Sequence, residues 1–276
     1  MSTPPTDLPA AGRLARAGYL PVDPDAAGRG TRRWWDEQSG AYLAEHGAFL
    51  GDARLRWGPE GLDEDDAGLL GDVTGRRLLE VGCGAAQGAR WAAARGALVL
   101  GVDVSAGMLA RSRELDARTG VGVPVVQADA GRLPLADGSV DVAFSAYGAL
   151  PFVADAAGVL AEVHRVLRPA GRWVFSVTHP VRWAFPDDPG PAGLTAVRSY
   201  FDRTPYAEVA ADGTVLYAEY HRTLGDWVRL VVGAGFDLID LVEPPWPSGH
   251  EHVWGGWSPT RGRLLPGTAV LVTDRR

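Results

Sequence analysis

The amino-acid sequence predicts an α/β protein built on a doubly wound, mostly parallel seven-stranded sheet with an antiparallel carboxyl-terminal edge. From residue 76 onward, short apolar runs alternate with helical stretches of ten or more residues, which is the pattern of strand–helix–strand units. Two glycines one residue apart follow the first apolar run. Near the carboxyl end, two strand-like runs follow each other without an intervening helix, which indicates an antiparallel pair.

The expected elements follow in order along the chain. Strands are expected over 76–81, 98–104, 123–129, 139–147, 171–179, 236–243 and 264–274, and helices over 86–95, 105–119, 155–167 and 223–233. A long loop over 244–263 joins the last two strands. Because strands separated by helices return in the same direction, the first five strands are expected to be parallel.

Two regions lie outside this alternation. Residues 1–30 are rich in Pro, Ala and Gly and predict a loosely held tail, and 31–57 predicts a helix with Trp35, Tyr42 and Phe49 spaced by seven. Residues 180–222 interrupt the rhythm after the fifth strand and contain a hairpin that turns at Asp212-Gly213. An insertion at the carboxyl edge of a parallel sheet lies over the ligand crevice. We therefore expect a tail and helical cap over 1–75, and a ligand-binding domain over 76–276 with an inserted lid.

Composition narrows the classes of function. The chain has 276 residues, 46% hydrophobic content and a formal charge of −7, which disfavours nucleic acid as a partner because phosphate binding needs clustered cations. No run of about eighteen apolar residues exists to span a membrane, and the N-terminus lacks the apolar segment of a secretory signal. The single cysteine leaves no internal disulfide and no multi-cysteine metal site. A cytoplasmic protein without a resident metal is expected, and its oligomeric state stays open.

The first strand and its glycine turn read LLEVGCGAAQGARW, residues 78–91. Gly82 and Gly84 permit a tight turn and a close approach of the backbone to a ligand at a helix N-terminus. A dinucleotide fingerprint expects glycine where Gln87 stands. Asp103 ends the second strand, nineteen residues after Gly84, and is placed to accept hydrogen bonds from a ribose diol. The pattern predicts a ligand that carries a nucleoside.

Four segments in order, LLEVGCGAA, GVDVSAGMLARSR, VVQADAGRLPLADGSVDVAFS and LAEVHRVLRPAGRWVFSV, resemble the class I, Rossmann-like S-adenosylmethionine-dependent methyltransferases. The resemblance covers about residues 76–180. It departs from the family at Ala86, where the family's first motif ends in glycine; alanine is small enough to keep the helix packed closely. The resemblance implies S-adenosylmethionine as methyl donor and an unidentified acceptor, expected to be a small molecule.

The resemblance also implies where each part of the donor lies. The glycine turn would hold the methionine part, Asp103 the ribose hydroxyls, and Asp129 with the backbone of Ala130 the adenine amino group. Met108 would lie against the adenine, and the end of the fourth strand would line the path of the methyl group. The implied donor-binding residues are Glu80, Gly82, Cys83, Gly84, Asp103, Val104, Met108, Asp129, Ala130, Ser145, Tyr147 and Tyr42.

Tyr42 has two interpretations. It lies on the N-terminal helix, which in similar methyltransferases often closes over the donor. Alternatively, it packs with Trp35 and Phe49 in an apolar stripe. The smallness of Cys83 is expected to matter more than its thiol, because a catalytic thiol needs an activating base nearby.

Methyl transfer from a sulfonium is an in-line displacement, and the enzyme's main task is to hold the nucleophile within about 3–3.5 Å of the methyl carbon. A base is needed only when the acceptor must lose a proton. His179, at the carboxyl end of the fifth strand, is the first candidate, although such a histidine also caps backbone groups. His221, Tyr200 and Tyr217 come next.

Other histidines invite weaker interpretations. His250-Glu251-His252 follows a Pro-rich stretch and is expected to lie in a surface or lid loop, because two histidines without a third ligand make a poor metal site. His164 follows helical spacing and is expected to be structural. Aromatic residues within 183–220 and 246–257 suggest a planar or partly apolar acceptor, or simply the packing of the lid.

Two other classes of function remain open from the sequence. A nicotinamide-dependent oxidoreductase shares the parallel sheet, the glycine turn and the acid at the end of strand two, but Gln87 argues against it. A non-catalytic S-adenosylmethionine-binding module would share every donor residue and differ only in lacking turnover.

Replacing Asp103 with alanine tests the ribose assignment. Loss of the carboxylate should weaken binding of S-adenosylmethionine, because the hydroxyls of the ribose lose a charged hydrogen-bond acceptor. Isothermal calorimetry measures the affinity directly. An unchanged affinity would show that the ribose lies elsewhere.

Overall fold

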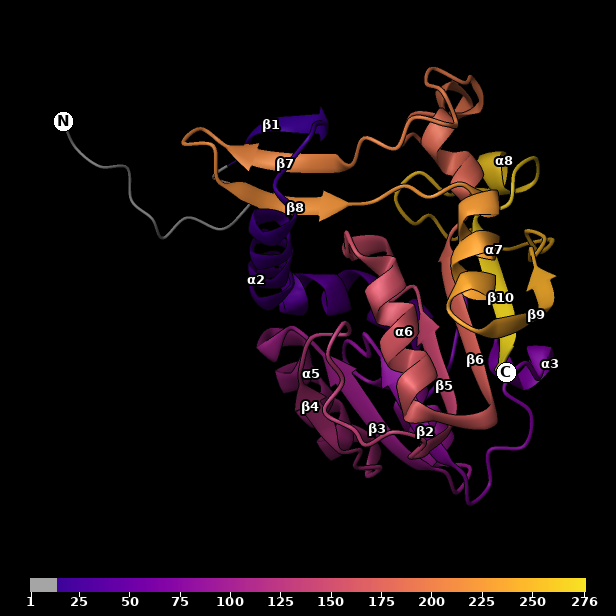
Figure 1. Cartoon of the computed structure of the whole chain (residues 1–276). Coiled ribbons are helices and arrows are strands. Elements are labelled where there is room, and N and C mark those ends of the chain that lie inside the picture. Colours follow the sequence, from indigo (N-terminus) through magenta and orange to yellow (C-terminus); the bar gives the residue numbers. More distant parts are fainter. Residues whose placement is uncertain (1–13) are drawn as a thin grey trace.

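A seven-stranded sheet covered by helices on both faces forms the centre of the computed structural model, which describes residues 14–276 (Figure 1). The strands lie in the order β4 (Val125–Gln127), β3 (Leu98–Asp103), β2 (Arg77–Val81), β5 (Val140–Ala146), β6 (Leu167–Thr178), β10 (Thr268–Arg275) and β9 (Phe236–Val242). The first five of these are parallel, and β10 pairs antiparallel with both β6 and β9. The predicted sheet with its antiparallel carboxyl-terminal edge is confirmed.

Two apolar layers fix the helices on the sheet. On one face Trp173 and Phe175 of β6 pack with the helices α6 and α7, and on the other Phe144 of β5 packs with α4. The helices are α2 (Pro24–Leu50), α3 (Glu64–Ala67), α4 (Gln87–Ala93), α5 (Ala106–Thr119), α6 (Ala156–Val166), α7 (Leu224–Gly233) and α8 (Pro259–Gly262), with 3-10 turns η1 (Leu150–Phe152), η2 (Pro180–Ala184) and η3 (Pro191–Leu194). Within residues 14–276, no helix combines the length and apolar character needed to cross a membrane.

Residues 1–13 of the expected tail lie outside the described part of the chain. From residue 14 onward, the structure has regular elements where the sequence predicted a loosely held tail. The strand β1 (Leu14–Tyr19) pairs with the insertion, and α2 begins at Pro24 rather than near residue 31. Asp23 caps this helix by accepting a hydrogen bond from the Ala26 amide at 2.8 Å, and a proline suits the first helical position. The local capping signal therefore outweighed the Ala- and Gly-rich composition.

The predicted hairpin in the insertion is present, with β7 (Tyr206–Ala210) and β8 (Val215–Glu219) on either side of Asp212-Gly213. It joins β1 in a separate three-stranded sheet in the order β1-β7-β8, which lies beside α2 (Figure 1). A Cβ atom at Gly30 of α2 would overlap the Val215 carbonyl group, and Thr31 Oγ1 accepts a hydrogen bond from the Ala218 amide at 3.0 Å. The N-terminal helix and the insertion thus pack directly against each other.

The long loop between β9 and β10 docks on the other end of α2 through stacked rings. Trp254 stacks on His46 with ring centroids 4.2 Å apart, and His252 stacks on Phe49 at 4.1 Å. The expectation that the His250–His252 segment lies in a loop is confirmed.

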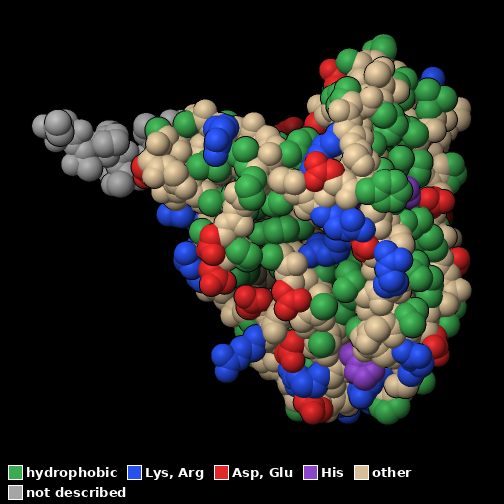
Figure 2. Space-filling view, turned by 45° about the horizontal axis from the view of Figure 1, so that its top comes forward, with side chains coloured by type: hydrophobic (Ala, Val, Ile, Leu, Met, Phe, Trp, Pro, Cys, Tyr) green, Lys and Arg blue, Asp and Glu red, His purple; other side chains and the backbone are tan. Residues whose placement is uncertain are grey.

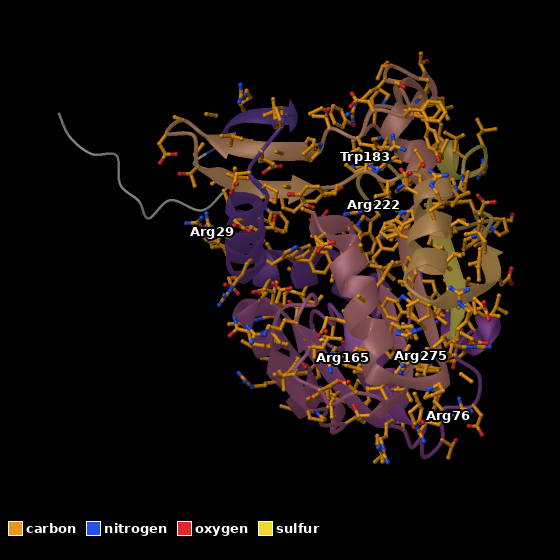
Figure 3. All side chains as sticks on the ribbon, viewed as in Figure 1. Arg29, Arg76, Arg165, Trp183, Arg222 and Arg275 are labelled. Carbon is orange, nitrogen blue, oxygen red and sulfur yellow. The ribbon has the colours of Figure 1, made fainter. Side chains whose placement is uncertain are left out.

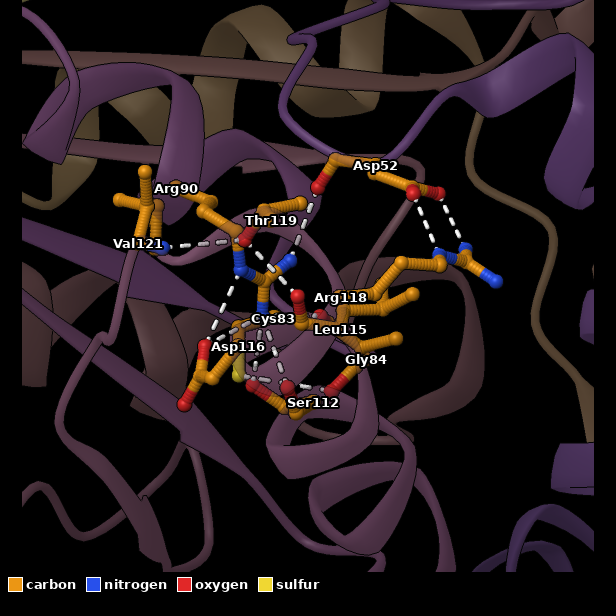
Figure 4. A network of polar contacts seen from close by, with 12 residues as sticks. Asp52, Cys83, Gly84, Arg90, Ser112, Leu115, Asp116, Arg118, Thr119 and Val121 are labelled. Atoms are coloured by element: carbon orange, nitrogen blue, oxygen red, sulfur yellow. Dashed lines mark hydrogen bonds and ion pairs between the residues drawn. The ribbon is translucent and has the colours of Figure 1, made fainter.

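A buried guanidinium joins the glycine turn, α4 and α5 (Figure 4). Arg90 is fully buried and donates to Asp116 Oδ1 at 2.9 and 3.1 Å, to the Ser112 carbonyl and hydroxyl at 3.0 Å, and to the carbonyls of Asp52 and Ala85. Every hydrogen bond replaces one that water would supply to the unfolded chain. Such a group is stabilising only while all of its partners remain in place.

Replacing Arg90 with methionine should lower the free energy of unfolding by about 3 kcal/mol, because Asp116 and several buried carbonyls lose their donor. Arg118→Met is the matched control, since Arg118 pairs with Asp52 at the surface and its side chain is 63% exposed, where a pair contributes about 0–1 kcal/mol. Urea unfolding of both variants measures the difference. Equal losses would contradict a special role for the buried guanidinium.

Candidate functional site

A cavity of about 680 Å³ runs along the carboxyl ends of the parallel strands, a size typical of small-molecule sites. The segments after β2, β3, β4 and β5 form its floor, and one face of α2 from Pro24 to Tyr42 forms the opposite wall. Acidic and basic side chains are interspersed over the face of the molecule shown in Figure 2. The cavity lies at the edge of the sheet where the sequence predicts ligand binding.

The glycine turn brings the backbone of two loops into contact. Gly82 has φ +67°, and a Cβ atom there would overlap the Ala149 backbone nitrogen in the loop after β5. Gly84 has φ +53°. Ala86 also adopts the left-handed conformation, with φ +57°, which costs a non-glycine residue about 1–2 kcal/mol. The departure from the family motif at this position therefore carries conformational strain.

Asp103 at the end of β3 links two of these loops. Its carboxylate accepts hydrogen bonds from the Gly84 amide and the Ser105 amide, both at 2.8 Å. Burial raises the pKa of Asp103 above its ordinary value, against the lowering effect of these two hydrogen bonds. The remaining acceptor positions on the carboxylate are available to a ligand hydroxyl.

Asp36 holds α2 over the cavity. Its Oδ1 accepts hydrogen bonds from Ser105 Oγ at 2.7 Å and from the Gly107 amide at 2.9 Å. A Cβ atom at Gly107 would overlap the Asp36 backbone, so the crossing with the N-terminal end of α5 depends on a glycine. No sequence motif identifies Asp36, because its partners lie about seventy positions away.

One end of the cavity suits an adenine ring. Asp129 and Ala130, after β4, line it together with Val104 and Met108. Asp129 Oδ1 accepts a hydrogen bond from the Gly131 amide at 2.8 Å, which orients the carboxylate in the loop.

The other end carries buried and paired charges. Glu80 is 5% exposed and accepts a hydrogen bond from the Ala89 amide at 2.7 Å. Burial raises the pKa of Glu80 from 4.5 to about 8. Arg54 and Arg56 line the same cavity, and both pair with Asp63, at 2.5 and 3.2 Å. Sequence reasoning missed these arginines, which lie in no recognisable motif.

Eleven of the twelve implied donor residues line the cavity; Ser145 does not. Ser145 is fully buried, and its hydroxyl faces the position that a Cβ atom of Gly148 would fill. Tyr147 lines the cavity, and Cys83 does so with a thiol whose pKa burial raises well above its ordinary value. Tyr42 both lines the cavity and packs on Trp35 at 5.2 Å, so its two interpretations are compatible. Binding of the donor by these residues remains a prediction.

His179, the first candidate base, lies outside the cavity wall. Its Nδ1 accepts a hydrogen bond from the Val181 amide at 3.1 Å, and its Nε2 lies 2.7 Å from Glu243 Oε1. This is the geometry of a residue that caps η2, and no contact with the cavity supports a catalytic role.

The alternative bases also lie outside the cavity wall. His221 Nε2 bonds to the Tyr200 carbonyl at 2.7 Å, and the Tyr217 hydroxyl donates to Glu219 at 2.5 Å. Trp183 stacks on His221 and lies near Arg222, between the three-stranded sheet and α7 (Figure 3). These contacts lie within the insertion itself.

The remaining histidines have structural partners. His250 Nε2 bonds to the Pro59 carbonyl at 2.8 Å, and His164 packs edge-on against Phe236 of β9. Over residues 14–276, no three His, Cys, Asp or Glu side chains cluster as metal ligands would.

The titration of Glu80 should be visible in stability. Between pH 4.5 and about 8 the folded chain holds a proton on Glu80 that the unfolded chain has released. The free energy of unfolding of the wild type should therefore fall as the pH rises through this window, relative to Glu80→Gln, which cannot titrate. Urea unfolding at several pH values measures both, with Glu45→Gln as control for an exposed carboxylate. Parallel curves for wild type and Glu80→Gln would contradict the raised pKa.

The family comparison covers the strands that form the cavity floor. Residues 79–175 match the model of the methyltransferase domain family. The 27-O-demethylrifamycin SV methyltransferase of Amycolatopsis mediterranei is 29% identical over 225 residues, which cover 80% of this chain and 76% of that protein. A demethylmenaquinone methyltransferase of a Mycobacterium strain is 41% identical over 105 residues, but the match spans only 38% of this chain and 43% of that relative.

Solved structures show the same fold. A Mesorhizobium loti S-adenosylmethionine-dependent methyltransferase is 30% identical, with a TM-score of 0.61, and the match covers 79% of this chain and all of that one. The Burkholderia thailandensis 1,6-didemethyltoxoflavin-N1-methyltransferase, solved with S-adenosylhomocysteine, has a TM-score of 0.59 at 17% identity over 95% of this chain and 94% of that one. At 17% identity, the similarity to the Burkholderia thailandensis enzyme shows the fold alone. Together with the sheet order and the cavity, these similarities show that the chain belongs to the class I S-adenosylmethionine-dependent methyltransferases.

Proposed function

We propose that the chain transfers the methyl group of S-adenosylmethionine to a planar or partly apolar small molecule bound at the Tyr147 side of the cavity. The observation that carries the proposal is that one cavity joins the glycine turn, Asp103 and Asp129 under the cover of α2. In this placement the nucleoside lies over β3 and β4, and the methionine part lies over β2.

The charges of the donor match those of the cavity. Its ammonium group would lie near Glu80, which a neighbouring cation would ionise. Its carboxylate would lie near Arg54 and Arg56, whose guanidinium groups Asp63 already holds in place. The ribose hydroxyls would donate to Asp103, and the adenine amino group to Asp129. Each polar part of the donor then has a partner of opposite charge or matching hydrogen-bond type.

The aromatic side chains of the cavity wall bear on the acceptor. Trp35, Tyr42, Tyr147 and Phe152 line it, and Trp35 packs edge-on against Phe152 at 5.5 Å. The aromatic residues of 183–220 and 246–257, which suggested a planar acceptor from the sequence, lie outside the cavity wall. The relatives named above act on 27-O-demethylrifamycin SV and 1,6-didemethyltoxoflavin, which makes these two compounds the first acceptors to assay.

The reaction needs alignment more than activation. The acceptor atom attacks the methyl carbon in line with the breaking carbon–sulfur bond, whose electron pair passes to sulfur. The protein contributes by holding both molecules at contact distance and by excluding water. The cover formed by α2 serves both purposes, because Asp36 fixes it over the donor cavity.

Two measurements separate this function from its alternatives. S-Adenosylhomocysteine at a hundredfold excess over its Kd should stabilise the fold by about 2.7 kcal/mol, and NADH should leave the thermal midpoint unchanged. Incorporation of label from methyl-labelled donor into an acceptor would exclude a non-catalytic binding module. Stabilisation by NADH alone would contradict the proposal.

Arg54→Gln tests the methionine end of the placement. Loss of a charge-assisted hydrogen bond should weaken binding of S-adenosylhomocysteine about tenfold, equivalent to about 1.5 kcal/mol. Arg95→Gln is the matched control, because Arg95 pairs with Asp65 outside the cavity. Calorimetry on both variants measures the affinities, and equal affinities would place the donor carboxylate elsewhere.

A further inference from the structure

A buried carboxyl group, that of Glu60, lies behind the cavity wall and is not among the residues that line the cavity. Glu60 is 2% exposed, and Thr268, at the start of β10, is fully buried. Glu60 Oε1 accepts a hydrogen bond from the Gly267 amide at 2.8 Å, and its Oε2 accepts one from Thr268 Oγ1 at 2.5 Å. Among residues 14–276, no cationic side chain forms an ion pair with it. Burying a carboxyl group without a cation is costly, so its presence requires an explanation.

The backbone around Glu60 is shaped to hold the carboxyl group. A Cβ atom at Gly58 would overlap Thr268 Oγ1 and lie 2.8 Å from Glu60 Oε2, and one at Gly267 would lie 2.6 Å from Glu60 Oε1. Any side chain at either glycine would displace the carboxyl group. Two separate segments of the chain therefore leave room for this one group.

The hydrogen-bond chain reaches the cavity through Tyr147. The Tyr147 hydroxyl lies 3.1 Å from Thr268 Oγ1 and 2.8 Å from the Gly267 carbonyl oxygen. Tyr147 has φ +55°, an unusual conformation for a bulky residue that tends to occur at functional sites. In this conformation its phenol reaches β10 while the residue still lines the cavity. The phenol has one proton and two acceptors within hydrogen-bond distance, so the proton can turn toward Thr268.

We propose that Tyr147, Thr268 and Glu60 form a proton-transfer chain that takes the proton of an O–H or N–H acceptor during methyl transfer. Tyr147 is the catalytic residue of this chain, and Glu60 is the positioning residue that receives the proton. The inference rests on the proposed function, which it deepens by naming the chemical class of the acceptor. The proposed base, Tyr147, lies on the cavity wall, whereas the base expected from the sequence, His179, does not line the cavity.

Atoms and charges balance along the chain. The acceptor oxygen or nitrogen bonds to the methyl carbon, and the carbon–sulfur bond breaks with its electron pair on sulfur. The acceptor proton passes to Tyr147 Oη, the phenol proton to Thr268 Oγ1, and the Thr268 proton to Glu60 Oε2. The sulfonium cation and the Glu60 carboxylate disappear together, so the step ends with two fewer charges in a poorly solvated site.

The titration behaviour of the groups fits this assignment. Burial raises the pKa of Glu60, and the hydrogen bond from Thr268 lowers it. Burial and the nearby Glu60 charge raise the pKa of Tyr147, while Arg182 lowers it. Tyr147 therefore stays protonated and relays a proton rather than acting as a phenolate. The nearby Thr178 side chain also lowers the pKa of the phenol, and His250 contacts the Glu60 loop through the Pro59 carbonyl.

The number of protons exchanged on ligand binding tests the proton-transfer chain, and this measurement needs no known acceptor. Calorimetric binding of S-adenosylmethionine and of S-adenosylhomocysteine, each in buffers of different ionisation enthalpy, counts the protons exchanged on binding. The sulfonium cation favours ionised Glu60, so the S-adenosylhomocysteine complex should hold a fraction of a proton more than the S-adenosylmethionine complex. Both ligands carry the same ammonium group, so its effect on Glu80 cancels in the difference. The effect of the sulfonium on Glu80 and Asp103, which line the cavity, remains in Glu60→Gln and is subtracted with that variant.

Three variants test whether Glu60 is a titrating group that responds to the sulfonium, which a purely structural role would not require. Glu60→Gln should reduce the difference between the two ligands to the part that the cavity-lining carboxyl groups contribute, because the amide cannot titrate. Thr268→Val should move the difference to higher pH, because the carboxylate loses a hydrogen bond that lowers its pKa. Thr273→Val is the control: it removes another fully buried hydroxyl from β10, one that donates to the Trp173 carbonyl, and should behave as the wild type.

Equal proton numbers for the two ligands in the wild type would overturn the proton-transfer chain, as would a difference in Glu60→Gln that is as large as in the wild type. If Glu60→Gln fails to fold, Thr268→Val decides. A shift of the proton difference to higher pH supports the proton-transfer chain, and an unchanged pH dependence overturns it. Failure of the wild type to bind either ligand would instead contradict the proposed function.

Discussion

The contact between the loops after β2 and β5 is the constraint on which the rest of the site depends. At Gly82 the two backbones approach so closely that no side chain fits between them. Asp103 then ties the same glycine turn to the start of α5, and Asp36 ties the start of α5 to α2. Floor and cover of the donor cavity are therefore connected by hydrogen bonds that begin at one turn.

Three segments distant in sequence build the cover over the sheet. The helix α2 contacts the hairpin of the insertion through Thr31 and the loop before β10 through stacked rings at His46 and Phe49. None of these contacts belongs to a methyltransferase motif. They use aromatic and small side chains, and they hold α2 over the cavity whose floor is formed at the edge of the sheet.

Buried carboxyl groups give the site its electrostatic character. Burial raises the pKa of Glu80, Asp103 and Glu60, because removal from water disfavours the charged form. S-Adenosylmethionine brings two positive charges, on its ammonium and sulfonium groups, into this environment. In the proposed placement, the neutral sulfide that remains after transfer has lost the sulfonium charge, so these carboxyl groups bind it less strongly and its release is favoured.

The order of secondary-structure elements could be predicted from the sequence because local signals specify them. Apolar runs, Ser105 and Asp155 as helix caps, and the Asp212-Gly213 turn each act within a few residues. The strand β1 could not be predicted in this way, because its side chains are mostly exposed and its pairing depends on β7, nearly two hundred positions away.

The same distinction holds at the site. Asp103 and Asp129 follow recognisable strands, so the sequence alone determined the sheet, the class of methyl donor and the edge of the sheet at which donor binding is proposed. Only the tertiary structure decided that Ser145 and His179 lie outside the cavity wall, that Asp36 holds α2 over the cavity, and that Glu60 connects to Tyr147 through Thr268. The physical reason is that a buried polar group acquires its role from its partners, and Thr268 lies 208 positions from Glu60.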